Sequence, residues 1–333
     1  MSSLKSSPDR DMPHLAKSDP PADERLLLVC PSCLGGLNLS DSSSLCDACG
    51  RVYPLSEYGY LDLTPRLEPG TRSDLPSTPD DYAHEQHSNG ERLFEEFLKP
   101  LLAKIRPRNA LDVGCGAGEM VRQFRKNEIR CFGIDLPSNA KHWSQAGADV
   151  RSVFGADARR LPFAANSFDF VMSLGVMEHI GTLNGHCTLS KTYTEDRSRY
   201  ADEIVRVTKP NGTIVIAAPN KLFPVDIQHG PTDALSRKAP VRSFVCDKTG
   251  LNIHKTWGDY HLPSYAEVRQ LFLTHAGART WEPLPLKGYF GFGRFKHGFL
   301  RPFSYLAETY VEHFPKSLLG TFLNPYVLVK ITK

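Results

Sequence analysis

The sequence predicts an α/β protein whose main domain is a doubly wound parallel sheet, preceded by a small cysteine-rich module. From Arg108 onward, short apolar stretches alternate with amphipathic helical ones, which is typical of such sheets. A glycine-rich turn joins the first of these stretches to a helix, and two CxxC pairs lie between Cys30 and Cys49. The length of 333 residues, with 41% apolar and 23% charged residues, suits one large domain and one small one.

The cysteine-rich module is the stretch CPSCLGGLNLSDSSSLCDACG. It holds four of the eight cysteines, which are Cys30, Cys33, Cys46 and Cys49. The N-terminus is polar and lacks the apolar core of a signal peptide, so we expect a cytoplasmic protein with reduced thiols. Paired CxxC knuckles then suit one structural, tetrahedral Zn²⁺ with no open position, although four buried or redox-active thiols are the alternative. We expect the strands of this zinc ribbon in LLLVC and RVYPL.

Composition divides the chain into four parts. We expect a disordered tail over residues 1–24, the zinc ribbon over 25–66, a linker over 67–90 and the main domain over 91–333. ERLFEEFLKPLLAKI has helical periodicity that Pro100 should kink or interrupt. Residues 221–262 break the α/β rhythm and predict either an insertion over an acceptor pocket or a long surface loop. No run approaches the roughly 18 apolar residues of a membrane helix.

The stretch NALDVGCGAGEMVRQFRK runs from an apolar strand into a helix. It contains one carboxylate and three glycines, which are Asp112, Gly114, Gly116 and Gly118. Such glycines let a nucleotide-like cofactor approach the backbone amides of a helix N-terminus, and a simple tight turn is the alternative. Asp135 ends the next strand, where a carboxylate can accept both ribose hydroxyls. Because Glu119 stands where a dinucleotide fingerprint needs glycine or alanine, we expect a cofactor without a pyrophosphate.

LDVGCGAG, GIDL, GADARRLPFAANSFDFVMSLGVMEHI and EIVRVTKPNGTIVIAAPN resemble the successive motifs of class I S-adenosylmethionine-dependent methyltransferases. The resemblance covers about residues 108–220 and implies a Rossmann-like seven-stranded sheet, which YVLVKITK would close as an antiparallel strand. It also implies S-adenosyl-L-methionine as the cofactor. The glycines would border its methionine and ribose portions, Asp135 would hold the ribose, and Asp112 would bind its ammonium or brace the loop.

The later motifs imply further contacts with the cofactor. Asp157 and Ala158 would contact the adenine, while Ser173 and Leu174 would line the methionine end. The carboxylate of Asp157 closes the apolar run VRSVFGAD and can accept a hydrogen bond from an exocyclic amine. A helix N-cap is the alternative role for this aspartate and for Asp135.

His179 is the candidate general base. The methyl group of a sulfonium is already activated, so transfer needs mainly positioning, but a hydroxyl acceptor must also lose a proton. Glu178 and His179 resemble the pair found here in many small-molecule methyltransferases, including those acting on ubiquinone precursors. A pair that only caps the loop is the alternative. Four other side chains compete for the role: His229, His254, Tyr260 and His261.

Eleven of the 33 aromatic residues lie between Tyr289 and Tyr326, and the first of them interleave with basic residues. This pattern fits an apolar acceptor pocket or a peripheral membrane-facing surface for a lipid-like substrate. It also fits RNA stacking or plain core packing.

We therefore expect methylation of a small-molecule or lipid-like acceptor, preferably at oxygen. The alternative is a ribosomal RNA methyltransferase, because the ribbon and YGYLDLTPR resemble the 23S rRNA guanine-N1 methyltransferases. That family commonly has a histidine where this chain has Cys49, and 40 basic against 37 acidic residues give a net charge of only +3. A non-catalytic, zinc-stapled interaction protein is a third reading.

Overall fold

The computed structural model describes most of the chain. The described residues are 28–40, 42–65, 80–183, 188–226, 229, 240–249, 251–290 and 301–333. The predicted disordered tail, residues 1–24, and residues 67–79 of the predicted linker lie outside them. None of the helices in these ranges is long and apolar enough to cross a membrane.

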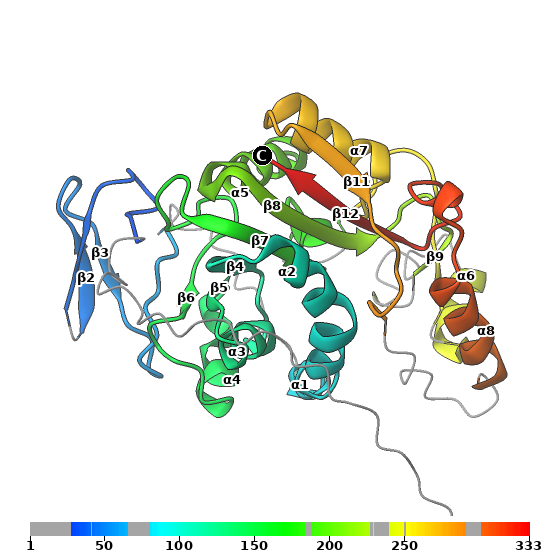
Figure 1. Cartoon of the computed structure of the whole chain (residues 1–333), viewed down its shortest axis with the longest axis horizontal. Helices are drawn as coiled ribbons and strands as arrows, with labels where there is room; N and C mark the ends of the chain where they lie inside the picture. Colours follow the sequence, from blue (N-terminus) through cyan, green and yellow to red (C-terminus); the bar gives the residue numbers. More distant parts are fainter. Residues whose placement is uncertain are drawn as a thin grey trace, which may run out of the picture.

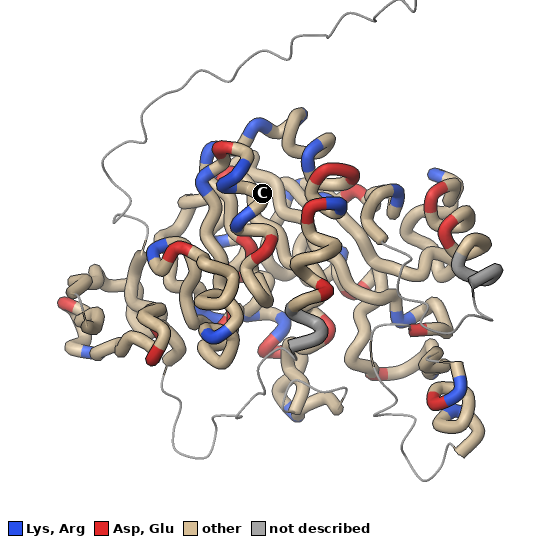
Figure 2. Tube along the Cα trace, turned by 90° about the horizontal axis from the view of Figure 1, so that it is seen from below, with Lys and Arg blue, Asp and Glu red and all other residues tan. Residues whose placement is uncertain are grey.

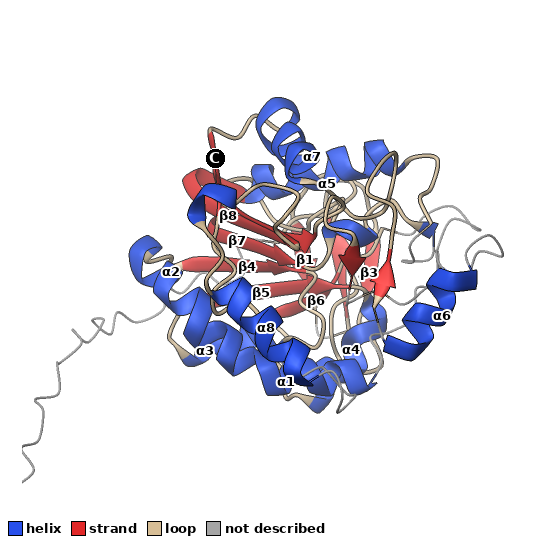
Figure 3. Cartoon of the chain, turned by 90° about the vertical axis from the view of Figure 1, so that its right-hand side faces the viewer, coloured by secondary structure: helices blue, strands red, loops and turns tan. Residues whose placement is uncertain are grey.

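The main domain is built on a seven-stranded sheet in the order β11-β12-β8-β7-β4-β5-β6. Figure 3 shows β8, β7, β4, β5 and β6 side by side. Its strands are β4 (Asn109–Val113), β5 (Arg130–Asp135), β6 (Val153–Gly155), β7 (Phe168–Leu174), β8 (Thr208–Pro219), β11 (Thr280–Pro283) and β12 (Tyr326–Thr332). Strands β4 to β8 pair in parallel, whereas β12 runs antiparallel to both β8 and β11. The predicted Rossmann-like sheet and its antiparallel closing strand are confirmed.

Helices cover both faces of this sheet (Figure 1). One face carries α1 (Asp80–Leu93), α2 (Lys99–Ile105), α3 (Glu119–Lys126) and α4 (Ala140–Gln145), and the other carries α5 (Tyr193–Val207) and α7 (Tyr265–Arg269). Alternate residues of β4 enter the two hydrophobic cores, Ala110 on one face and Leu111 and Val113 on the other. Burial on both faces explains the near-continuous apolar strands of the sequence.

The helix before the sheet begins earlier than the sequence predicts. Residues 80–90, expected to belong to the linker, form most of α1, and a π-helical turn over Phe94–Leu98 joins α1 to α2. The polar composition of α1 hides this helix, because contacts with α3 rather than an apolar stripe secure it. Pro100 lies in the first turn of α2, where its missing N–H is tolerated after the wide turn.

The cysteine module folds as a three-stranded antiparallel sheet of β1 (Leu37–Leu39), β2 (Ser43–Cys46) and β3 (Val52–Pro54). β3 lies in the predicted RVYPL. The prediction for LLLVC is wrong for its described residues: Leu28 and Val29 form only isolated bridges. Leu28 pairs with Phe163 of the main domain instead, so tertiary contacts override the β-propensity of this stretch.

The ribbon is joined to the main sheet at its β6 edge. Leu63 donates its backbone N–H to the Gly155 carbonyl at 2.7 Å, and Gly155 donates to the Leu61 carbonyl at 2.9 Å. Leu61 and Leu63 also enter the same core as Phe154 and Phe163. This pairing covers an otherwise open sheet edge and ties the stability of the ribbon to that of the main domain.

The region between β8 and α7 contains an antiparallel pair of short strands, β9 (Val225–Asp226) and β10 (Asn252–Ile253). Helix α6 (Pro240–Thr249) lies between these strands in the sequence. α7 begins at a capping box between Ser264 and Glu267, which fits the predicted helix SYAEVRQLFLTHAG. The last α-helix among the described residues, α8 (Arg301–Glu312), precedes β12. Figure 1 places the ribbon at one end of the long axis of the molecule and α6 and α8 at the other.

Candidate functional site

The glycine-rich loop connects β4 to α3. Gly114, Gly116 and Gly118 all have positive φ, at 82°, 54° and 83°, which a side chain would strain. Helix α3 begins immediately after Gly118, so the backbone amides of the loop and of the first helical turn lie at the carboxyl end of β4. This arrangement suits a ligand that accepts hydrogen bonds from backbone N–H groups.

Asp135 connects the end of β5 to this loop. Its Oδ2 accepts a hydrogen bond from the Gly116 N–H at 2.6 Å, and its Oδ1 accepts one from the Leu136 N–H at 2.6 Å. Burial raises the pKa of Asp135. Asp112, inside β4, is 4% exposed, and burial together with the charge of Asp135 raises its pKa to about 8. Two carboxyl groups thus share the region beneath the glycine loop.

Asp157 and Ala158 follow β6, as the sequence predicts. Both carboxylate oxygens of Asp157 accept hydrogen bonds from Arg159, the shortest being 2.7 Å from Nη2. Arg159 also forms an ion pair of 2.9 Å with Asp196. The pairing was not among the predictions, although the adjacent arginine is visible in GADARR.

Ser173 and Leu174 end β7. Ser173 is fully buried, and its Oγ donates to the Val113 carbonyl at 2.9 Å, so the hydroxyl braces β7 against β4. Because β4, β5, β6 and β7 are parallel neighbours, their carboxyl ends meet at one edge of the sheet. The structure therefore brings together at that edge all the residues predicted to bind a cofactor.

Helix α1 adds a side chain that the sequence analysis did not identify. Gln86 Oε1 accepts a hydrogen bond from the Ala117 N–H at 2.8 Å, and a Cβ placed on Gly116 would lie 2.4 Å from the same oxygen. His87 Nδ1 lies 2.7 Å from the buried Glu119 carboxylate at the start of α3. These contacts hold α1 against the glycine loop. No local sequence motif predicts them.

A second cluster of polar side chains follows β7. Glu178 and His179 lie in a 3₁₀ turn (Met177–His179), and His229 follows β9. The Nε2 atoms of His179 and His229 are 3.4 Å apart, and His229 Nε2 is 4.0 Å from Glu178 Oε1. Sequence spacing gives no hint of this contact, which the fold makes between residues 50 positions apart.

Burial shapes the electrostatics of this cluster. The side chain of Glu178 is 1% exposed, and burial raises its pKa to about 7. Its Oε2 is buried and has no hydrogen-bond partner among the described residues. Burial alone would lower the pKa of His229, but the Asp226 carboxylate, 2.7 Å from Nδ1, raises it above the ordinary value.

Aromatic rings form one wall of the cluster. The rings of His261 and His229 are 5.2 Å apart, and Tyr260 is 4.5 Å from His261 and 5.1 Å from the parallel ring of His254. The four competing candidates are therefore linked by successive ring contacts that start at His229, which contacts His179. The cluster also adjoins the glycine loop, because a Cβ on Gly114 would lie 2.2 Å from Val176 Cγ2, two residues before Glu178.

The four cysteines of the ribbon form a third cluster. The Sγ atoms of Cys30 and Cys49 are 3.7 Å apart, and those of Cys33 and Cys46 are 3.5 Å apart. Metal–sulfur bonds of about 2.3 Å in a tetrahedron place neighbouring sulfurs about 3.8 Å apart. Tyr53 hydroxyl lies 3.1 Å from Cys30 Sγ and supports it from the ribbon core. The geometry therefore suits one tetrahedral ion.

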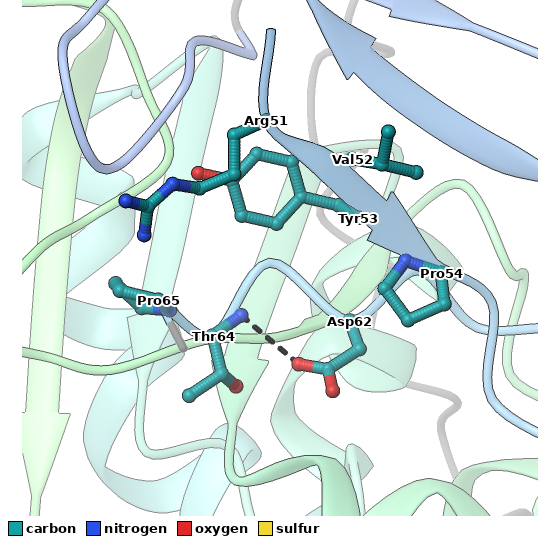
Figure 4. A pocket seen from close by; sticks show the side chains of 7 residues that line it. All are labelled: Arg51, Val52, Tyr53, Pro54, Asp62, Thr64 and Pro65. Carbon is teal, nitrogen blue, oxygen red and sulfur yellow. Dashed lines mark hydrogen bonds between the residues drawn. The ribbon is translucent and has the colours of Figure 1, made fainter. Parts of the chain in front are cut away.

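A pocket lies on the ribbon between β3 and the segment leading out of it (Figure 4). Arg51 and Tyr53 line one side, and Asp62 and Thr64 line the other, where Thr64 donates its N–H to Asp62 Oδ1 at 2.9 Å. None of the residues predicted to bind a cofactor lines this pocket. It is separate from the glycine loop.

Comparison with known proteins gives matches to the central part of the chain. Residues 111–216 match the family described as "Methyltransferase domain". Ajmaline N-methyltransferase of Rauvolfia serpentina is 30% identical over 130 residues, which are 37% of this chain and 39% of that protein. "Probable tocopherol O-methyltransferase, chloroplastic" of rice is 30% identical over 136 residues, 38% of this chain and 34% of that protein.

A third relative, "Probable fatty acid methyltransferase" of Mycobacterium tuberculosis, is 38% identical over 80 residues, 22% of this chain and 18% of that protein. The chain thus spans less than two fifths of the length of these three curated relatives. Among solved structures, phosphoethanolamine N-methyltransferase 2 of Haemonchus contortus with S-adenosyl-L-methionine has a TM-score of 0.37 at 19% identity, covering 68% of this chain and 48% of that one. An S-adenosylmethionine-dependent methyltransferase of Mesorhizobium loti has a TM-score of 0.39 at 14% identity, covering 70% and 96%.

Proposed function

We propose that this chain, which carries a class I S-adenosylmethionine-dependent methyltransferase domain, transfers the methyl group of that cofactor to a small-molecule or lipid-like acceptor. One observation carries the proposal: the glycine loop held by Asp135 and the cluster of Glu178, His179 and His229 adjoin each other at one sheet edge. The first suits a nucleoside cofactor, and the second suits an acceptor that must lose a proton.

The cofactor-binding residues follow from the position of each strand end. The three glycines would expose backbone amides to the cofactor, Asp135 would accept hydrogen bonds from the ribose, and Asp112 would face the ammonium group. Asp157 and Ala158 would border the adenine, with the Asp157 carboxylate fixed by Arg159. Ser173 and Leu174 would line the methionine end. Gln86 would have to yield its hydrogen bond with Ala117 or share it with the cofactor.

The chemistry assigned to the chain is positioning and proton removal. The cofactor supplies a methyl group on a positively charged sulfur. For a hydroxyl acceptor, oxygen forms a bond to this methyl carbon as the carbon–sulfur bond breaks, and the hydroxyl proton must leave. Within the cluster, His179 is the sequence-predicted base, and the Asp226–His229 pair is oriented to share that task. We therefore propose O-methylation.

Two observations favour an apolar acceptor. The three relatives named above carry ajmaline, tocopherol and fatty acid in their names. The chain also exposes large apolar side chains on α6 and α8: Val241 and Phe244 are 73% and 63% exposed, and Tyr305 and Leu306 are 70% and 62% exposed. Such exposure is typical of surfaces that receive apolar ligands or insert between lipid headgroups and acyl chains. Of the aromatic-rich segment, residues 291–300 lie outside the described residues.

An RNA acceptor is the second candidate, because the ribbon resembles that of the rRNA guanine-N1 methyltransferases. Figure 2 shows acidic and basic residues interspersed along the trace rather than a broad basic face. This distribution favours the small-molecule acceptor. For the ribbon itself, we propose one structural zinc held by the four cysteines, since four thiolates leave no position for a substrate.

The test is methyl transfer from radiolabelled S-adenosylmethionine into extract fractionated into RNA, lipid and small molecules. Label in the lipid or small-molecule fraction is expected, and label confined to RNA would favour the second candidate. Failure of S-adenosylmethionine to bind in calorimetry, with correctly folded protein, would overturn the function itself. A Gly116→Val variant is the control, because its side chain would occupy the space taken by Gln86 and the loop.

A further inference from the structure

The cluster after β7 presents three potential ligand atoms to one point. Glu178, His179 and His229 each offer an oxygen or nitrogen, and these atoms all lie within 4.8 Å of one another. With metal–nitrogen bonds of about 2.0–2.1 Å, a tetrahedral ion places two ligand nitrogens about 3.3–3.4 Å apart. The Nε2 atoms of His179 and His229 are 3.4 Å apart. Their separation is therefore that of two imidazoles sharing one ion.

The tautomer of His229 explains why a cation suits this point. Asp226 Oδ2 accepts a hydrogen bond from the Nδ1–H group of His229 at 2.7 Å. Neutral His229 then directs the lone pair of Nε2 toward His179 and Glu178. The carboxylate of Glu178 is also an acceptor, and its Oε2 is buried without a hydrogen-bond partner among the described residues. Converging lone pairs repel one another unless a proton or a metal ion lies between them.

The surroundings match those of a catalytic metal ion. A carboxylate behind a ligating histidine fixes its tautomer and raises its basicity, which is the position of Asp226 behind His229. Two histidines and one glutamate are a ligand set of catalytic zinc sites, and such sites keep an open position. The nearby guanidinium of Arg197 donates to the carbonyl oxygens of His261 and Ile180 and leaves the ligand atoms facing one another.

We propose that Glu178, His179 and His229 bind one divalent transition-metal ion whose open position takes the acceptor oxygen. The role in catalysis rests on the proposed methyl transfer, whereas the metal site stands on the geometry alone. Coordination lowers the pKa of the acceptor hydroxyl, and its proton passes to solvent. The resulting oxygen anion forms the bond to the methyl carbon as the carbon–sulfur bond breaks, which releases S-adenosylhomocysteine. His179 is then a ligand in place of a free base.

The test is a titration with Co²⁺ of the full-length chain carrying one zinc ion per chain, enough for the four ribbon cysteines only. Binding at the cluster should give weak visible absorption from a nitrogen- and oxygen-ligated ion, at one equivalent per chain. Replacement of the ribbon zinc would instead give intense sulfur-to-cobalt charge transfer, so the two sites are distinguished spectroscopically. His229→Ala and Glu178→Gln should each weaken Co²⁺ binding at least about 100-fold, and Asp226→Asn by about 10- to 100-fold.

His275→Ala is the matched control, because His275 also pairs with a carboxylate, Asp202 at 3.1 Å, but on an exposed surface. Its Co²⁺ affinity should equal that of the wild type. Glu178→Gln preserves side-chain shape and keeps the test decisive if His229→Ala unfolds. The proposed site would be overturned if the wild type showed no visible absorption with Co²⁺. It would also be overturned if both cluster variants bound Co²⁺ with unchanged affinity. Calorimetry of S-adenosylmethionine with the same samples separates this failure from failure of the proposed function.

Discussion

The ribbon and the cluster after β7 both converge on a point that suits a cation, but they are built from the chain in opposite ways. Each pair of ribbon cysteines comes from one CxxC turn, and all four lie between Cys30 and Cys49. The other cluster needs His229, 50 positions after His179, and a carboxylate behind it. Four thiolates close a coordination sphere, whereas three ligands leave one position for chemistry. Local spacing thus predicts the proposed structural site, whereas only the fold brings the members of the proposed reactive site together.

The largest effect should follow from removing one of the four cysteine ligands of the ribbon. Cys46→Ser should lower the zinc content below one per chain and unfold the ribbon, because zinc binding supplies about 10–16 kcal/mol in isolated modules. Cys46 shares a core with Leu61 and Phe163, so the thermal midpoint of the main domain should fall as well. Elemental analysis and limited proteolysis measure both changes. The control is Cys246→Ser, which alters a buried cysteine of α6. Zinc-free wild-type protein of full stability would refute the structural role.

A smaller but more selective effect, on turnover alone, should follow from replacing His179 in the cluster after β7. His179→Ala should lower turnover by about 10²- to 10⁴-fold while leaving S-adenosylmethionine affinity almost unchanged, because His179 serves the acceptor rather than the cofactor. Single-turnover methyl transfer beside calorimetry measures this split. If cofactor affinity and thermal stability fall together, His179 is only a structural residue, and the comparison between the two sites fails.

The parts that the sequence predicts are those that short-range patterns encode. The apolar strands, the glycine-rich loop and the carboxylate at the end of β5 follow from local spacing. Three features became visible only in the folded structure. The polar helix α1 is held by Gln86 and His87. Arg159 binds the carboxylate of Asp157. His229 contacts His179. Each of these depends on which partner one particular side chain contacts in the folded chain. A composition or periodicity pattern does not encode such contacts.

A moderate effect on cofactor affinity is expected for Asp135, which lies beside the glycine loop. Asp135→Ala should weaken S-adenosylmethionine binding by about 1.5–3 kcal/mol, the range for hydrogen bonds to a charged group. Calorimetry measures the loss, and NADH should bind neither protein. Asp202→Ala, an exposed aspartate on α5, should bind the cofactor as the wild type does. Undiminished affinity in Asp135→Ala would show that the carboxylate only braces the Gly116 amide.

The smallest effect concerns Asp112, a buried carboxyl group at the same sheet edge. Its folded-state pKa of about 8 lies above the unfolded value of about 3.9, so between these values the folded state holds one proton more than the unfolded state. The free energy of unfolding therefore falls as pH rises through this window, by about 1 kcal/mol between pH 6 and 7. Asp112→Asn has no proton to lose and should be free of this decline.

Urea unfolding of the wild type and of Asp112→Asn at about pH 6 and pH 7 measures the difference in pH dependence. The titrations of the histidines are common to both proteins and cancel in this difference. Asp202→Asn, altered at an exposed site, should follow the wild type. Adding Co²⁺ should stabilise wild type and Asp112→Asn equally at each pH, because the ion binds at Glu178 and its partners. If Co²⁺ instead abolished the pH-dependent difference, the ion would lie at Asp112 and Asp135. The reactive site would then have to be moved from the acceptor side to the cofactor side of the sheet edge.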